Sequence, residues 1–324
     1  MRMPFIAVVM IAFAGFTGAD AQTYPSRPIT IIVPFAPGAG ADISARIAGE
    51  YMSRQLGVQV VVENTAGGGG TVGTTRSARS APDGYTIALG HMGTHAASVP
   101  LYPNLAYDPR VDFEPIGLIV EQPMTLVTRK DFPANTLQEF VAYAKANESK
   151  LNLSHAGIGS VSFTACFLLN SAIGIKPTAI PFNGTAPAMN AIIARQVDYL
   201  CDTVLGVVPQ VAAGTIKVLA IATEKRNASL PQIPTSREAG VPGFQSAPFF
   251  GLFVPKGTPK PIVDKLAEAL DKALDDEGAR KRLEGLGADI PDKSKRGPAA
   301  LAALVRSEIA RLSPILAPFA VKTN

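Results

Sequence analysis

The sequence predicts an α/β protein built from two units. Short runs of β-branched residues, typical of strands buried on both faces, alternate with stretches that carry a helical stripe of apolar residues. Glycine-rich loops precede helices in two separate parts of the chain. The chain has 324 residues, of which 47% are hydrophobic, so it is long and apolar enough for two domains. This alternation is typical of parallel sheets with crossover helices.

The first unit opens with a strand, a glycine loop and a helix. A strand is expected at residues 29–33, where isoleucine and valine follow one another. Gly38 and Gly40 lie in the loop, Asp42 is expected to cap the next helix, and apolar residues then recur every four positions through residues 43–56. Backbone N–H groups at such a helix start lie beside the positive end of the helix dipole. Such a place attracts an anion, but the same pattern also fits a strand-to-helix turn that binds nothing.

The other expected elements follow in order. After the first helix come strands at residues 58–62, 85–89, 113–120 and 124–128, and helices at 71–80 and 136–147. The second glycine-loop unit has strands at 151–155, 178–182, 196–202 and 217–223, and helices at 161–172 and 188–195. A strand at 249–254 and helices at 258–274, 279–286 and 299–312 end the chain.

The C-terminal tail has no glycine loop of its own, so we expect it to pack back on the first unit. The first lobe would then be discontinuous and comprise residues 22–124 and 243–324. The second lobe would comprise residues 125–242.

The N-terminus has the pattern of a secretory signal peptide. Arg2 precedes an apolar run at residues 4–16, and Ala19-Asp20-Ala21 is a small-x-small cleavage site. The apolar run is shorter than the roughly 20 residues that cross a bilayer, which argues against a membrane anchor. We therefore expect residues 1–21 to be removed and the mature protein, which would start at Gln22, to be exported.

Composition and motifs argue against nucleic-acid binding and against catalysis. The formal net charge of +4 comes from scattered residues, and tryptophan is absent. Residues 68–73 contain G-x-G-x-x-G, but the next strand does not end in the acidic residue that would bind a ribose, and no P-loop lysine follows. The chain has no G-x-S-x-G elbow and no H-E-x-x-H motif. We expect no catalytic residue, no cofactor and no metal; an NAD-linked enzyme would rest on the glycine run alone.

The two cysteines, Cys166 and Cys201, leave two alternatives open. They pair if the protein folds in an oxidising compartment and their elements are neighbours. Otherwise they are two separate buried thiols.

A series of short motifs runs through the mature chain. They are Pro28–Asp42, Glu63-Asn64 before the glycine run, Pro82–Thr86, Tyr107-Asp108-Pro109, Gly157–Ser160, Pro181–Pro187, Pro231–Thr235, Glu238–Gly240 and Phe250–Pro259. In this order they resemble the periplasmic substrate-binding proteins of tripartite tricarboxylate transporters, often called the Bug family. Two departures concern the ligand: Phe163-Thr164 stands where the family often has His-Leu, and Phe249-Phe250-Gly251 where it often has Trp-Phe-Gly.

The resemblance implies a two-lobed periplasmic-binding-protein fold (type II, Venus flytrap) with a carboxylate held between the lobes. In such proteins the loop after the first strand holds one ligand carboxylate, and loops of the second lobe grip the other end. The candidate ligand-binding residues are Phe35, Ala36, Gly38, Ala39, Gly40, Asp42, Ala66, Thr71, Thr94, Gly159, Ser160, Gly184, Thr185 and Asp202.

The expected function is to capture a small organic carboxylate, which could be a di- or tricarboxylate, an amino acid or an aromatic acid, and to deliver it to a membrane permease. A carboxylate sensor that docks on a periplasmic signalling receptor needs the same pocket and is the alternative. We expect a monomer that binds no nucleic acid. The candidate loops contain no Lys or Arg, so backbone N–H groups, water and the hydroxyls of Thr71, Ser160 and Thr185 would have to bind the carboxylate.

Overall fold

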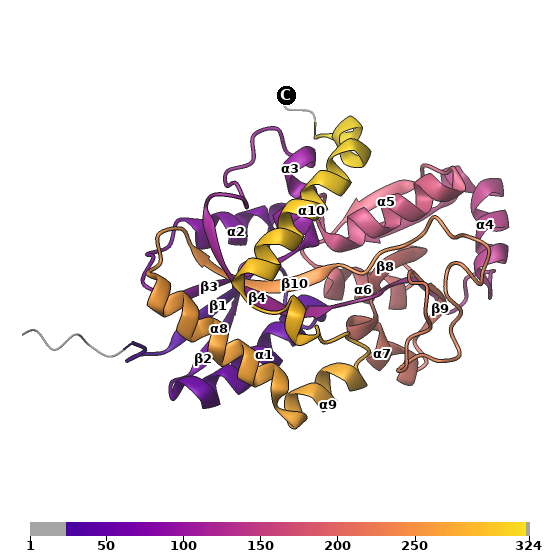
Figure 1. Cartoon of the computed structure of the whole chain (residues 1–324). Coiled ribbons are helices and arrows are strands. Elements are labelled where there is room, and N and C mark those ends of the chain that lie inside the picture. Colours follow the sequence, from indigo (N-terminus) through magenta and orange to yellow (C-terminus); the bar gives the residue numbers. More distant parts are fainter. Residues whose placement is uncertain (1–23, 322–324) are drawn as a thin grey trace, which may run out of the picture.

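The computed structural model describes residues 24–321. The expected signal peptide, residues 1–21, lies outside this range. The described chain forms two five-stranded sheets with helices packed around them. Figure 1 shows the two sheets side by side along the long axis of the molecule, with β4 and β10 running from one toward the other.

The first sheet has the strand order β2-β1-β3-β10-β4. Its strands are β1 (Ile29–Val33), β2 (Val60–Asn64), β3 (Thr86–His91), β4 (Phe113–Glu121) and β10 (Phe249–Pro255). Strand β1 is parallel to β2 and β3, whereas β10 is antiparallel to both β3 and β4. The helices beside this sheet are α1 (Gly40–Leu56), α2 (Thr71–Ala78), α3 (Ser98–Leu101), α8 (Lys260–Asp275), α9 (Glu277–Gly285) and α10 (Pro298–Leu316).

The second sheet has the strand order β7-β6-β8-β5-β9. Its strands are β5 (Met124–Arg129), β6 (Asn152–His155), β7 (Thr178–Pro181), β8 (Tyr199–Thr203) and β9 (Ile216–Ile221). Strand β6 is parallel to β7 and β8, and β5 is antiparallel to β8 and β9. Its helices are α4 (Leu137–Ala146), α5 (Val161–Ile173), α6 (Thr185–Ile193) and α7 (Val204–Ala212).

Both sheets are therefore mixed, whereas the alternation of strands and helices predicts parallel sheets. Parallel pairing holds where a crossover helix connects two strands of one sheet. Strands β5 and β10 are antiparallel to their neighbours. The chain enters each of them from the opposite sheet rather than through a crossover helix of the same sheet.

We call the first sheet with its helices the first lobe, and the second sheet with its helices the second lobe. Gln122 and Pro123 alone separate β4 from β5, so one extended segment passes through both sheets. Beside it, Gln122 N donates to Pro248 O (3.0 Å) and Met124 N donates to Ser246 O (2.9 Å). This pair of adjacent segments forms the connection about which the lobes can move, and we propose lobe boundaries at residues 124 and 243.

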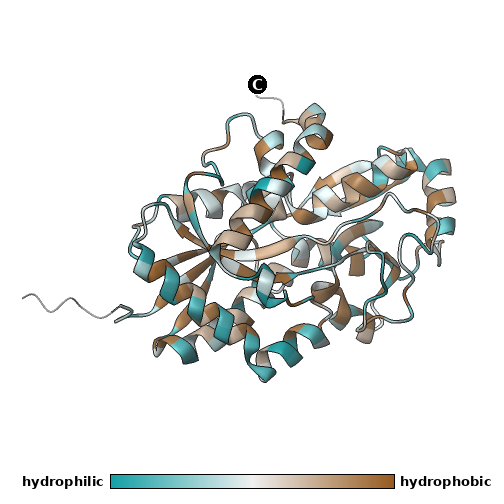
Figure 2. Cartoon of the chain, in the orientation of Figure 1, coloured by the Kyte–Doolittle hydropathy of each residue, from teal (hydrophilic) through white to brown (hydrophobic). Residues whose placement is uncertain are grey.

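The hydrophobic residues lie where the layers meet. All residues of β10 are buried, and four of the five in β1 are buried. Figure 2 shows hydrophobic residues along the strands and hydrophilic residues on the outer turns of helices such as α8 and α9. Within residues 24–321, no helix has both the length and the apolar character needed to cross a bilayer.

Candidate ligand-binding site

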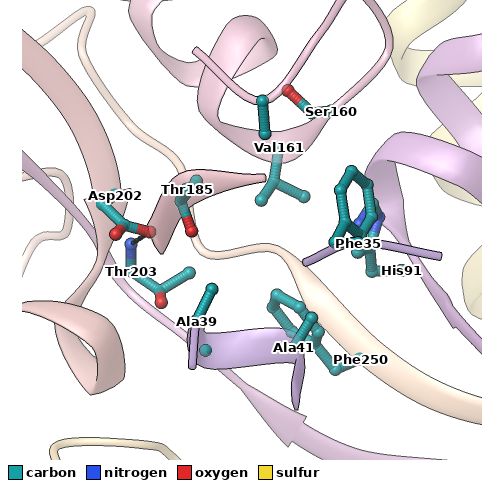
Figure 3. A pocket seen from close by; sticks show the side chains of 12 residues that line it. Phe35, Ala39, Ala41, His91, Ser160, Val161, Thr185, Asp202, Thr203 and Phe250 are labelled. Atoms are coloured by element: carbon teal, nitrogen blue, oxygen red, sulfur yellow. Dashed lines mark hydrogen bonds between the residues drawn. The ribbon is translucent and has the colours of Figure 1, made fainter. Parts of the chain in front are cut away.

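A small cavity lies between the two lobes, and Figure 3 shows the side chains around it. Its volume is about 20 Å³, which is room for about one water molecule. The first lobe lines it with the start of α1 and the ends of two strands, and the second lobe with three segments that each lead into a helix. The lining residues are Phe35, Ala39, Gly40, Ala41, His91, Phe250, Ala156, Ser160, Val161, Thr185, Asp202 and Thr203.

Three helices begin at the cavity wall. Helix α1 begins at Gly40, α5 at Val161 and α6 at Thr185, and all three residues line the cavity. Helices α1 and α6 have no side-chain cap, because Ala39 and Gly184 stand at their N-cap positions. The first N–H groups of a helix lack partners inside it, and the helix dipole is positive at that end. Three such ends around one cavity favour an anionic guest.

Asp42 does not cap α1, contrary to the expectation from the sequence. The helix begins at Gly40, so Asp42 lies in its first turn. Its Oδ2 accepts hydrogen bonds from Gly38 N and Arg46 Nε, both at 2.9 Å, and its Oδ1 accepts one from Asn64 Nδ2 at 2.9 Å. Burial opposes ionisation of Asp42, but these three hydrogen bonds outweigh it and hold its pKa below the usual value. An ionised Asp42 thus fixes the loop between β1 and α1.

Aromatic rings form the first-lobe side of the cavity. The ring of His91 stacks on that of Phe35, with 5.0 Å between the ring centroids. It meets the ring of Phe250 edge-on, with 5.3 Å between the centroids. The Nδ1 atom of His91 accepts hydrogen bonds from the backbone N–H groups of Gly93 (3.0 Å) and Thr94 (3.2 Å), which places the ring proton on Nε2. Burial lowers the pKa of His91 to about 4, so this wall is uncharged at neutral pH.

Hydroxyl groups and one carboxyl group form the second-lobe side. Ser160 Oγ accepts a hydrogen bond from Phe163 N (3.2 Å) and so caps α5. Asp202 Oδ1 accepts one from Thr203 N (2.8 Å). Burial raises the pKa of Asp202 to about 7, against the opposing effect of that N–H group and the Thr185 hydroxyl. The Thr203 hydroxyl is buried and has no hydrogen-bond partner among the described residues.

The lobes also touch beside the cavity. Ala36 N donates a hydrogen bond to Asn183 O (3.0 Å), and the Tyr102 hydroxyl donates one to Ile158 O (2.7 Å). Gly69 lies against the same carbonyl group, where a Cβ would overlap Ile158 O, and its φ of +65° is one that glycine adopts without strain. The lobes are thus in a closed arrangement.

The cavity brings together part of the candidate set from the sequence. Its lining includes Phe35, Ala39, Gly40, Ser160, Thr185 and Asp202. The other candidates stand outside the lining and remain predictions. They are Ala36 and Gly184 at the contact between the lobes, Gly38 and Asp42 in the loop before α1, Thr94 beside His91, Gly159 next to Ser160, and Ala66 and Thr71 at the outer glycine run.

Six lining residues were not among the candidates. They are Ala41, His91, Ala156, Val161, Thr203 and Phe250. Thr203 directly follows the candidate Asp202 at the end of a strand, and this position in the sequence could have identified it. His91 and Phe250 carry no such signal, because an aromatic residue at the end of a buried strand looks the same whether it packs in the core or faces a ligand.

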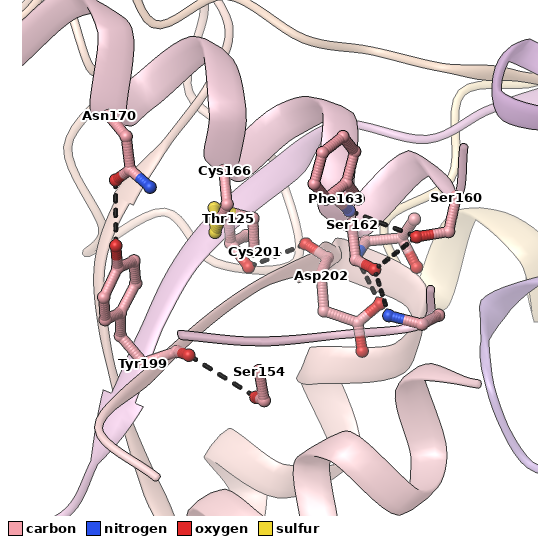
Figure 4. The surroundings of a disulfide bond; sticks show 12 residues. Thr125, Ser154, Ser160, Ser162, Phe163, Cys166, Asn170, Tyr199, Cys201 and Asp202 are labelled. Carbon is pink, nitrogen blue, oxygen red and sulfur yellow. Dashed lines mark hydrogen bonds between the residues drawn. A yellow bond between two sulfur atoms is a disulfide. The ribbon is translucent and has the colours of Figure 1, made fainter. Parts of the chain in front are cut away.

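A disulfide braces the second lobe close to the cavity. It joins Cys166 in α5 to Cys201 in β8, so of the two alternatives that the sequence leaves open the structure has the paired one. Figure 4 shows it one residue from Asp202, with Thr125 Oγ1 donating a hydrogen bond to Asp202 O (2.9 Å). The end of β8 is therefore held by the disulfide to α5 and by the hydrogen bond from β5.

Known proteins resemble the chain over nearly its whole length. The protein family described as "Tripartite tricarboxylate transporter family receptor" matches residues 44–319. A protein of Agrobacterium vitis, "UPF0065 protein in the TAR-I ttuE-ttuC' intergenic region", is 40% identical over 317 residues, which are 98% of this chain and 91% of that protein.

Two solved structures have the same fold. One is MatC (Rpa3494) from Rhodopseudomonas palustris with bound malate, which is 46% identical with a TM-score of 0.88 over 90% of this chain and 100% of that chain. The other is the periplasmic binding protein BugD, which is 42% identical with a TM-score of 0.88 over 91% of this chain and 98% of that chain.

Proposed function

Because the chain belongs to the tripartite tricarboxylate transporter receptor family, we propose that it is a periplasmic solute-binding protein that captures a small organic dicarboxylate between its lobes and delivers it to a membrane permease. The family and the two-lobed periplasmic-binding-protein fold are those that the sequence predicts, and the comparisons confirm both. The matched proteins are solute-binding proteins rather than enzymes.

One observation carries the choice of ligand class. The cavity between the lobes is lined by three helix N-termini and by hydroxyl groups, and no Lys or Arg is among its lining residues. Backbone N–H groups at helix starts bind carboxylates without a side-chain cation. The related MatC holds malate, a dicarboxylate, and supports the same class here.

Ligand capture requires the lobes to move. The cavity has room for about one water molecule, whereas a dicarboxylate has several heavy atoms. The lobes are joined by adjacent extended segments at Gln122–Pro123 and at residues 246–248, which suits a hinge. We therefore propose that the lobes open to admit the ligand and close on it.

A dicarboxylate is expected to stabilise the protein against heat. A ligand at 100 times its dissociation constant that binds only the folded state adds about 2.7 kcal/mol to the free energy of unfolding. Thermal-shift measurements with malate and with shorter and longer dicarboxylates test this, with a neutral sugar as the control. A response to the sugar and to none of the carboxylates would contradict the proposed function, and loss of the protein from its host should lower uptake of the dicarboxylate that responds.

Arg46→Ala is expected to weaken dicarboxylate binding only mildly. The Arg46 side chain is half exposed and does not line the cavity, although it donates a hydrogen bond to the buried Asp42. Asp42 keeps its hydrogen bonds from Gly38 N and Asn64 Nδ2 when Arg46 is removed, so we expect a loss of about 1 kcal/mol at most and a rise in the dissociation constant of about fivefold or less. Isothermal titration calorimetry measures it. Complete loss of binding would mean that Arg46 meets the ligand directly.

A further inference from the structure

We propose that Asp202 meets the ligand as a neutral carboxylic acid, so that in alkaline solution capture of a dicarboxylate takes up one proton. The inference rests on the proposed function and names the protonation state in which the site binds its ligand. It follows from where the carboxyl group lies, what surrounds it and which charges are missing around the cavity.

Asp202 cannot turn away from the cavity. Its side chain is 3% exposed and lines the cavity from the end of β8. Thr203 N donates to its Oδ1, and the Thr125 hydroxyl donates to its backbone carbonyl group. The disulfide at Cys201 ties the same strand to α5. The carboxyl group therefore stays at the cavity wall when the lobes are closed.

Among the residues that the structure describes, no positively charged group faces this carboxyl group. The segments packed around it present Thr185 from α6, Gly206 from α7 and Thr125 from β5. No Lys or Arg lines the cavity, and His91, its other titratable residue, is held neutral by burial. Burial also raises the pKa of Asp202 to about 7, and no neighbouring charge contributes to that shift.

An ionised Asp202 would place a third negative charge beside a doubly charged ligand. The cavity lining contains no cation, so the carboxylate of Asp202 and a ligand carboxylate beside it cannot both stay ionised. A neutral Asp202 removes the repulsion and supplies an O–H donor, and O–H···O⁻ hydrogen bonds are among the short, strong ones. In the binding reaction, an ionised Asp202 takes one proton from solution as the dicarboxylate dianion binds. The product is a protonated Asp202 whose O–H donates a hydrogen bond to a ligand oxygen.

The expected pH dependence follows from this balance. At a pH below the pKa of Asp202 in the ligand-free protein, Asp202 already carries its proton, so the affinity does not change with pH. Above it each pH unit lowers the affinity about tenfold, because a proton must be taken up with the ligand. Above about pH 7 a simple dicarboxylate is almost fully ionised, so the ligand itself contributes little to the pH dependence there.

Calorimetric titration with malate between pH 6 and 9 tests the proposal. Each pH is measured in two buffers with different heats of ionisation, so that proton uptake is counted directly. The wild type should bind about a hundredfold more weakly at pH 9 than below pH 7 and should take up one proton at pH 9. Asp202→Asn keeps the shape and offers an N–H donor, so its affinity should be constant across this range without proton uptake. Asp264→Asn, an exposed change on α8, is the matched control and should behave as the wild type.

Other outcomes would overturn the inference. Wild-type binding with constant affinity and no proton uptake would mean that binding does not change the protonation of Asp202, and the proposed uptake would be wrong, although the proposed function would stand. Uptake that persists in Asp202→Asn would assign the proton to another group. Preference for an amino-substituted dicarboxylate, lost in Asp202→Asn, would mean that an ionised Asp202 pairs with a cationic ligand group. Absence of binding of any dicarboxylate at every pH would contradict the proposed function itself.

Discussion

Replacing Gly40 with alanine is expected to abolish dicarboxylate binding while the protein stays folded. Gly40 is the first residue of α1, and a Cβ there would collide with Thr203 Oγ1 of the second lobe and lie 2.6 Å from Gln122 Oε1. The Gln122 side chain is flexible, but Thr203 is short, β-branched and almost fully buried, so its contact with the added Cβ is relieved mainly by separation of the lobes. We expect the affinity measured by calorimetry to fall more than about a hundredfold, which is about 2.7 kcal/mol.

The folded state of this variant should be unharmed. Gly40 lies in a helix and has no positive φ, and alanine is favoured over glycine inside helices by about 1 kcal/mol. Gly285→Ala in α9 is the matched control, because nothing lies within 4 Å of the added Cβ, and it should bind as the wild type. Full affinity in Gly40→Ala would show that the ligand is held without the lobes coming this close.

Removal of the disulfide is expected to give the largest loss of stability. Cys166 and Cys201 are separated by 35 residues in the chain. Closing a loop of that length lowers the entropy of the unfolded chain, and the bond should stabilise the second lobe by roughly 3–4 kcal/mol. The double variant Cys166→Ala, Cys201→Ala should lose that amount in urea unfolding, with a steeper slope of the transition, because the unfolded chain without the cross-link exposes more surface.

Reduction of the wild type provides the companion measurement. Because both sulfurs are buried, reduction should be slow in the native state and should then lower stability as far as the double variant does. A loss below about 1 kcal/mol in both experiments would mean that the packing of α5 on β8, rather than the covalent bond, holds this part of the lobe together.

Local sequence patterns predict most of the elements but not the direction of every strand. The apolar run and the glycine loop place β1 and α1 within a few residues of their observed bounds, because burial and helix periodicity act over short distances. The antiparallel directions of β5 and β10 depend on the lobe from which the chain arrives, which no local pattern contains. Asp42 illustrates a local conflict: aspartate favours the N-cap position, yet α1 begins at Gly40 without any side-chain cap.

The candidate site was predictable where glycine and hydroxyl residues precede a helix. Gly40, Ser160 and Thr185 line the cavity because helix starts from both lobes converge there. The glycine run at residues 67–70 has the same local signature, but Gly69 contacts Ile158 beside the cavity. Gly69 serves close approach between the lobes, and only the tertiary arrangement separates this role from ligand binding.

The place of β10 in the first sheet has a consequence for the order of folding. β10 lies between β3 and β4, yet the whole second lobe separates it from β4 in the chain, where Phe249 pairs with Glu121. Contacts between such distant residues form slowly, because the loop-closure entropy is lost before they form. A growing chain that ends before β10 leaves β3 and β4 without the strand between them. We therefore expect the first sheet to form late, once β10 is available to pair with both β3 and β4.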